Sequence, residues 1–238
     1  RLDHAPQLVE RDGELGECAA RRLDHEKMRR AAIDAGLDRG HRAEAVVEEH
    51  NNGLSLSAED DLMRGGISSP LRTSAHRSAY SPLHDRLQPE SASLCGSCHD
   101  VVTPAGVHLE RTFVEWQDSV FSQPGLSQLT CGNCHMRGRD GPAANLEDAP
   151  VRRVHDHSMP GVDIAVTEFP ERDVQRAAVQ AALDSALIAS ICVRPDSGLI
   201  AIEVTLENAG SGHLFPSGSA QDRRVWVEVI AFLEGEQV

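Results

Sequence analysis

Alternating apolar and polar residues predict β-structure in the C-terminal part of the chain. The segment 186–193 is rich in branched apolar residues, and from Ile200 to Leu206 such residues at the even positions alternate with Ala, Glu and Thr. The turn-forming sequence Pro195-Asp196-Ser197-Gly198 separates the two runs, which predicts a β-hairpin. The same enrichment predicts a third strand over 224–232, and the sequence at 234–236 is typical of a turn into a fourth.

Helical spacing predicts two helices earlier in the chain. Residues 24–35 carry charges of alternating sign at this spacing, which is typical of a helix with a solvated face. Between residues 112 and 121, the side chains of Phe113, Trp116, Val120 and Phe121 fall on one stripe, which predicts a helix that packs on the core. Gly-Gly, Ser-Ser-Pro and Ser-Pro sequences punctuate residues 51–88 and predict a loop with a short turn of helix.

These elements predict an α+β chain with a loop-rich, mainly α domain followed by a β-sandwich-like segment. We expect a charged, partly helical N-terminal segment over 1–50, a domain over 51–175 and an incomplete β-segment over 180–238, with the boundary near 170–185. The chain begins at Arg1, so we expect that a leader was removed or that this is a piece of a longer protein.

Composition excludes some functions and predicts a core with few aromatic side chains. The net charge of −14 makes the chain a poor ligand for nucleic acid. No apolar run reaches the roughly 18 to 20 residues of a membrane-spanning helix, so none is expected. The chain has only five Phe, two Trp and one Tyr. A core without further apolar groups would therefore depend on Ala, Val, Leu and Ile.

Four of the six cysteines form two sequence motifs of the type C-G-x-C-H. They are Cys95-Gly96-Ser97-Cys98-His99 and Cys131-Gly132-Asn133-Cys134-His135. A histidine directly after a C-x-x-C pair is typical of covalent attachment of haem c. The two thiols add to the two vinyl groups of one porphyrin, and the histidine becomes the proximal ligand of its iron. The sequence therefore predicts two haems, with His99 and His135 as proximal ligands.

Two other uses of paired cysteines fit less well. A zinc ribbon also has two C-x-x-C pairs, but the stretch between these pairs is longer than usual and zinc does not explain the histidines. A redox-active dithiol requires a strand-to-helix context that neither pair has. The remaining Cys18 and Cys192 are interpreted either as buried apolar thiols, which we favour, or as a disulfide in an oxidising compartment.

Several histidines outside the motifs have sequence contexts that suit distal haem ligands. His155 and His157 alternate in the segment 150–161, so on an extended chain they share a face. His213 lies in a loop constrained by two preceding glycines and a following Phe-Pro. Arg152 and Arg153 are interpreted either as partners of haem propionates or as ordinary surface arginines.

Residues 60–238 resemble the bacterial multihaem c-type cytochromes in which a haem-bearing region precedes a β-sandwich module, the cytochrome c-554-like group. The two C-G-x-C-H motifs are generic to haem c proteins. The segments Arg153-Val154-His155-Asp156-His157-Ser158-Met159-Pro160-Gly161 and Glu207-Asn208-Ala209-Gly210-Ser211-Gly212-His213-Leu214-Phe215-Pro216-Ser217-Gly218, followed by Arg224 and Trp226, are more specific.

The resemblance implies haems with two histidine ligands, the second supplied from elsewhere in the chain. It makes His157 and His213 the first choices as distal ligands, with His155, His76 and His84 as reserves. The chain departs from the group around Cys18, where no second cysteine and no histidine complete a motif. Further haems would then lie in a missing part or on a partner.

With both axial positions filled by histidine, electron transfer is the expected function, rather than enzymatic catalysis. An acidic chain suits basic redox partners, among them other cytochrome subunits. The alternative is a multihaem oxidoreductase that acts on a small nitrogen or sulfur oxyanion at an open haem. A third hypothesis has the β-segment dock onto a larger complex. The resemblance implies a periplasmic or extracellular location, because haem is attached outside the bacterial inner membrane.

Overall fold

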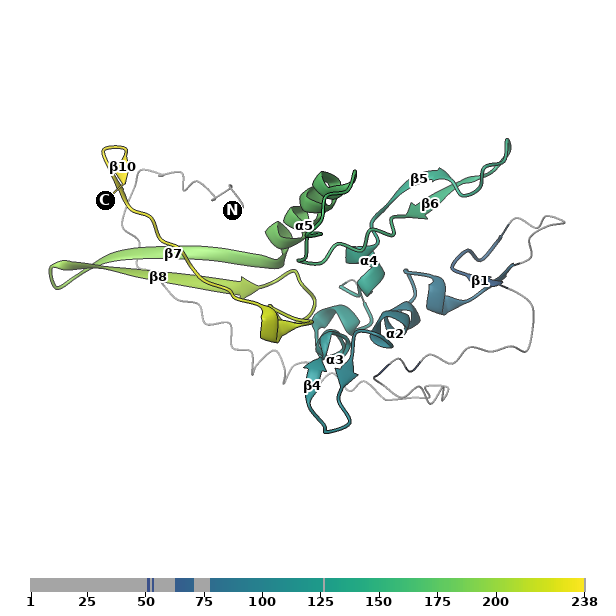
Figure 1. Ribbon diagram of the computed structural model, residues 1–238, viewed down its shortest axis with the longest axis horizontal. Coiled ribbons are helices and arrows are strands. Elements are labelled where there is room, and N and C mark those ends of the chain that lie inside the picture. The colour runs from purple at the N-terminus through teal and green to yellow at the C-terminus, as the bar shows by residue number, and fades with distance from the viewer. Residues whose placement is uncertain (1–50, 52, 54–62, 71–77, 126, 238) are drawn as a thin grey trace. The chain divides into compact units, whose positions relative to one another are not determined.

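The computed structural model describes residues 51, 53, 63–70, 78–125 and 127–237 (Figure 1). The helix expected over 24–35 lies outside these residues. The described residues form four α-helices and five two-stranded sheets, a mixture of α and β structure. Of the described residues, 191–204 belong to one compact unit and the others to a second, larger unit.

Short elements dominate the larger unit as far as residue 155. Two strands pair in parallel near its start, and the two hairpins that follow are antiparallel. In chain order the elements are β1 (Met63–Gly65), β2 (Ser78–Tyr80), the 3-10 helix η1 (Pro82–His84), α2 (Glu90–Gly96), β3 (Val101–Val102), β4 (His108–Glu110), α3 (Thr112–Gln117), the 3-10 helix η2 (Val120–Ser122), α4 (Cys131–His135), β5 (Gly138–Pro142) and β6 (Val151–His155). The turn of helix expected in the loop before residue 88 is η1.

Helix α2 lies at the centre of this region, because it contacts both α3 and α4. Its Ala92 is fully buried, and Phe113 of α3 is 8% exposed and stacks on Trp116 with ring centroids 5.8 Å apart. Besides Ala92 and Phe113, only two hydrophobic side chains are buried among the described residues, Val179 and Ala186. The hydrophobic core of the described residues is therefore small.

The predicted helix over 112–121 is shorter than its apolar stripe. Helix α3 ends at Gln117, and Ser119 accepts a hydrogen bond from the backbone N–H of Phe121 at the start of η2. The Ser119 hydroxyl thus competes with continued helix. Phe113 and Trp116 pack as expected, but Val120 is 53% exposed, so its assignment to the buried stripe was wrong.

Helix α5 (Arg172–Ala186) leads directly into the strand β7 (Leu187–Asp196). β7 pairs with β8 (Leu199–Asn208), which confirms the predicted hairpin, and Ser197 and Gly198 form its turn with φ values of 50° and 89°. The predicted domain boundary at 170–185 overlaps α5.

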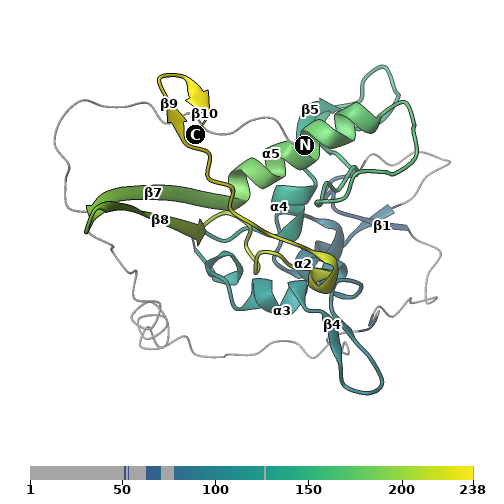
Figure 2. The ribbon, with the colours of Figure 1, turned by 60° about the vertical axis from the view of Figure 1, so that its left-hand side comes forward.

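The third predicted strand, over 224–232, is wrong. Residues 223–231 follow the 3-10 helix η3 (Ala220–Asp222) without regular structure, and Trp226 is 77% exposed. Only β9 (Phe232–Leu233) and β10 (Glu236–Gln237) pair, around the expected turn at Glu234-Gly235 (Figure 2). Branched and aromatic residues favour a strand only where a neighbouring strand or layer covers them. No helix in the described part of the chain is long and apolar enough to cross a membrane.

Candidate functional site

The first C-G-x-C-H motif spans the end of α2 and is held by the hairpin that follows it. Nδ1 of His99 lies 2.8 Å from Oε1 of Glu110, the last residue of β4. The next residues in each segment also pair, because Nε of Arg111 lies 2.5 Å from Oδ1 of the fully buried Asp100. Two neighbouring pairs of charged or ionisable groups therefore join the motif to the end of β4.

The second motif forms α4, and its variable residue, Asn133, caps the N-terminus of the helix. The Thr130 N–H donates to Oδ1 of Asn133 at 2.7 Å, half of a capping box. Arg86, just after η1, caps the C-terminal end of α4, because its Nη1 donates to the carbonyl oxygen of Met136 at 2.8 Å. The same guanidinium nitrogen lies 3.4 Å from the carbonyl oxygen of Gly132.

The glycine shared by both motifs allows close packing of each helix. A Cβ on Gly96 would overlap the ring of Phe113, and a Cβ on Gly132 would lie 2.8 Å from Cβ of Arg86. Both distances are too short for non-bonded carbons. The matching glycines are thus explained by what packs on α2 and α4.

The two motifs meet through their first cysteines. Helices α2 and α4, which carry Cys95 and Cys131, contact each other. Interaction with the Cys131 side chain lowers the pKa of the Cys95 thiol to about 7, and the same interaction raises the pKa of the Cys131 thiol. Cys95 is therefore the more nucleophilic thiol near neutral pH.

The loop after β8 brings His213 to the second motif. The rings of His135 and His213 lie 6.4 Å apart between centroids, with 17° between their planes. Two imidazoles that bind one metal ion from opposite sides, with nitrogen–metal bonds of about 2 Å, have centroids roughly 6 Å apart. The spacing of these two rings fits shared ligation of one iron.

Helix α3 fixes the loop that carries His213. Oε2 of Glu115 accepts from the backbone N–H of Leu214 at 3.2 Å and from the hydroxyl of Ser217. Thr112 lies 2.7 Å from the same hydroxyl and accepts from the N–H of Gly218 at 3.1 Å. The aromatic helix between the motifs thus also holds the loop.

Four histidines share one pattern at Nδ1. A carbonyl or carboxylate oxygen can only accept, so Nδ1 must donate and the neutral ring keeps its lone pair on Nε2. Burial lowers the pKa of His135, which favours its neutral form. The four pairs are His99 with Glu110, His135 with the Pro160 carbonyl at 2.8 Å, His157 with the His155 carbonyl at 3.1 Å and His213 with the Leu214 carbonyl at 2.8 Å.

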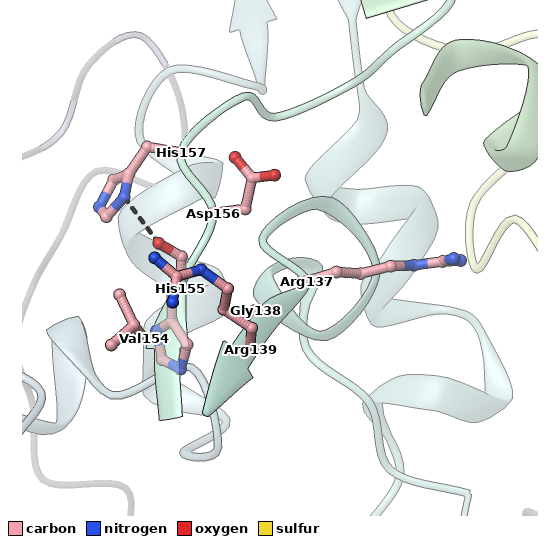
Figure 3. A pocket seen from close by; sticks show the side chains of 7 residues that line it. All are labelled: Arg137, Gly138, Arg139, Val154, His155, Asp156 and His157. Carbon is pink, nitrogen blue, oxygen red and sulfur yellow. Dashed lines mark hydrogen bonds between the residues drawn. The ribbon is translucent and has the colours of Figure 1, made fainter. Parts of the chain in front are cut away.

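His157, the other first-choice distal ligand, is exposed and lies at the base of the β5–β6 hairpin (Figure 3). It lines a hollow of about 460 Å³ together with His155 and residues that follow the second motif, among them Arg137 and Gly138. Burial lowers the pKa of His155. His84 ends η1 and is exposed, and His76 lies outside the described residues.

The two arginines expected near haem propionates have protein partners. Arg152 donates to the hydroxyl and carbonyl oxygens of Ser69, at 3.1 and 2.7 Å. Arg153 lies 3.8 Å from Asp140 across the β5–β6 pair.

The remaining cysteine alternatives are decided in part. Cys192 is disulfide-bonded, so its interpretation as an apolar thiol was wrong, and Cys18 lies outside the described residues. All four motif cysteines carry thiols. Across the described ranges, no three His, Cys, Asp or Glu side chains are grouped so that they could hold a metal ion.

Sequence reasoning missed the residues that orient the histidines. Glu110 reaches His99 because the chain folds back in a hairpin, whereas Glu115 and Arg86 contact segments that are far away in the sequence. No sequence motif marks such contacts. The Pro160 carbonyl lies within a segment singled out by the resemblance, but for its histidines and not for its backbone. Comparison with protein-family models, curated proteins and solved structures found no match to this chain.

Proposed function

We propose that this protein transfers electrons through two covalently attached c-type haems. The observation that carries the proposal is the neighbouring pair His135 and His213, whose ring spacing of 6.4 Å suits one iron between them. By this proposal the chain is a subunit or piece of a larger multihaem electron-transfer system, in the periplasm or outside the cell.

The donor groups fit haem c at both motifs. Cys95 and Cys98 would hold one haem and Cys131 and Cys134 the other, with His99 and His135 as proximal ligands. Each histidine donates its Nδ1 proton to an oxygen, which supports Nε2 as the atom that binds iron. A bound haem would supply one-electron exchange at its iron.

Exposed apolar residues beside the histidines support a large apolar group at the second motif. Met159, next to Pro160, is 55% exposed, and Leu214, next to His213, is 62% exposed. Few hydrophobic side chains are buried in the described residues, as noted above. A haem covered by such residues would bury apolar surface that the protein chain alone leaves in water.

The protein's own residues set the chemistry. His135 and His213 would leave no axial position for a substrate, which favours electron transfer over catalysis. Glu115 and Thr112 hold the His213 loop in place, so ligation requires little rearrangement when the iron changes charge. Helices α2 and α4, which carry the two attachment sites, contact each other, which favours exchange between them.

The deciding experiment is a pyridine haemochrome assay combined with the intact mass of protein matured in a periplasm. Two haems per chain are expected, with low-spin ferric spectra and no binding of carbon monoxide to the reduced second haem. A chain without thioether-linked haem would overturn the proposal. Stoichiometric carbon monoxide binding at both haems would instead favour the oxidoreductase with an open site.

A further inference from the structure

The two motifs differ in the group that accepts the Nδ1 proton of the proximal histidine. For His99 the acceptor is the carboxylate of Glu110, at 2.8 Å, whereas for His135 it is the neutral carbonyl of Pro160, also at 2.8 Å. A carboxylate makes an imidazole a more basic ligand than a carbonyl does, and its charge stabilises the more positive ferric iron.

Other charges nearby increase this difference. Asp100 pairs with Arg111, so these two charges cancel beside the first motif. Beside the second motif, the partly buried guanidinium of Arg86 donates hydrogen bonds to the carbonyl oxygens of Gly132 and Met136. A cation at that position destabilises ferric iron relative to ferrous iron.

We propose that Glu110 makes the haem on Cys95 and Cys98 the lower-potential one of the pair, so that an electron is more stable on the haem of Cys131 and Cys134. This inference rests on the proposed function. Each iron passes between Fe(III) and Fe(II) by one electron, received from one redox partner protein and delivered to another. Electrons would then enter at the first motif and leave from the second.

The position of Glu110 suits this role. It is the last residue of β4, opposite Val101 of β3, and its side chain is only 21% exposed. The hairpin that places it begins two residues after His99. Glu110 is thus a positioning residue for His99 that is built into the fold directly after the first motif.

The test is a spectroelectrochemical titration of the haem-loaded wild type and of Glu110→Gln, which keeps an oxygen acceptor but removes the charge. At a fixed applied potential near the lower midpoint, the ferrous-to-ferric ratio of the first haem should rise about tenfold. Loss of the hydrogen-bond partner of a metal-binding histidine typically changes metal affinity or activity by about 10- to 100-fold, and we take the lower value. Tenfold corresponds to 59 mV for one electron. The upper wave should stay unchanged. Asp118→Asn, which removes an exposed carboxylate at the end of α3, should move neither wave.

Double variants with one motif removed assign the waves. Cys131→Ala with Cys134→Ala should leave a haem of lower potential than Cys95→Ala with Cys98→Ala leaves. This comparison also tests the order of the two potentials if Glu110→Gln does not take up haem. Two bound haems with the opposite order, or an equal shift in Glu110→Gln and Asp118→Asn, would overturn the inference while leaving electron transfer intact. Absence of haem would overturn the proposed function itself.

Discussion

The orientation of each proposed iron ligand depends on one hydrogen bond from Nδ1. For His213 the acceptor is the carbonyl oxygen of the next residue, Leu214, so the loop backbone itself sets the ring. For His135 the acceptor is Pro160, 25 residues away along the chain. A local contact thus fixes the distal ring, whereas the proximal ring depends on correct folding of the segment after β6.

Replacing His213 tests its assignment as a ligand. In His213→Ala we expect two haems to remain attached, because the thioether bonds are untouched, but one iron should become high-spin when ferric and bind carbon monoxide when reduced. Optical and electron paramagnetic resonance spectra measure both effects. His108→Ala, which removes an exposed histidine of β4, is the control and should resemble the wild type. A fully low-spin His213→Ala protein would contradict the assignment.

Replacing Gly96 tests the packing of α2 on α3. The added Cβ of Gly96→Ala meets the ring of buried Phe113, and overpacking of this kind costs about 1–3 kcal/mol. Better helix propensity offsets about 1 kcal/mol of that cost. The midpoint of thermal unfolding of the haem-loaded protein should fall. Gly161→Ala, where a Cβ has open space, should leave it within error.

The cysteines and histidines of the candidate site were predictable from sequence, but their second partners were not. The C-x-x-C-H pattern itself indicates which histidine would bind the haem iron, because attachment to the porphyrin requires a fixed spacing of the cysteines and the histidine. No such spacing links Glu110 to His99 or Arg86 to α4, since a turn and a tertiary contact create these pairs. The resemblance implies His213 as a ligand without assigning it to a motif, and the structure places its ring 6.4 Å from that of His135.

Among the secondary structure elements, α3 has two roles. One side packs Phe113 against α2, and another presents Glu115 and Thr112 to the loop of His213. The position of the proposed distal ligand is therefore tied to the core through one short helix.

Removal of the Glu115 carboxylate should loosen this loop without removing haem. Hydrogen bonds to a charged group contribute about 1.5–3 kcal/mol, so Glu115→Ala should weaken the iron–His213 bond by a part of that energy. We expect a high-spin fraction that grows with temperature, measured by optical spectroscopy. Asp118→Ala, at the end of the same helix, should show no such fraction. Identical spectra for the two variants would mean that the loop does not depend on Glu115.

The pair Asp163 and Arg223 joins the segment after Pro160 to the segment after the His213 loop. Both guanidinium Nη atoms lie 2.7 Å from the carboxylate oxygens, and this hydrogen bonding lowers the pKa of Asp163 below 3.8. A lowered folded-state pKa means that the stabilisation exists above the unfolded pKa and is lost as pH falls through the folded one. Because Asp163 is 77% exposed, we expect only about 0.5 kcal/mol.

A double-mutant cycle of Asp163→Asn and Arg223→Gln measures this coupling in the free energy of unfolding. The coupling should be present at neutral pH and vanish below the folded pKa of Asp163. A coupling that persists at strongly acidic pH would contradict the ion-pair interpretation.

The strands show where apolar patterning predicts an element and where it does not. The β7–β8 hairpin followed from alternation together with a Ser-Gly turn that requires positive φ. Residues 224–231 have equal β propensity but lack a neighbouring strand, and Val225, Trp226 and Val227 remain at least 50% exposed. Propensity alone does not specify pairing, which is why the sandwich-like segment was predicted more fully than it is observed.

The scarcity of aromatic residues fits the small core of the described chain, where four hydrophobic side chains are buried. By the proposal, the porphyrins would supply the missing apolar surface. Protein made without haem should then fail to become compact, and limited proteolysis of cytoplasmically expressed chain tests this. A protease-resistant haem-free form would show that side chains alone suffice.

The net charge of −14 gives a prediction for electron exchange in solution. A cationic small-molecule reductant such as hexaammineruthenium should reduce the protein faster than an anionic cyanide complex of similar driving force, by about tenfold or more at low salt. Because the screening length falls from about 30 Å at 0.01 M to about 10 Å at 0.1 M salt, added salt should slow the cation and accelerate the anion. Stopped-flow absorbance measures both rates, with a neutral reductant as control. If added salt instead accelerated the cation and slowed the anion, a local basic patch near the haems rather than the total charge would govern the encounter, and a basic partner would lose its electrostatic advantage.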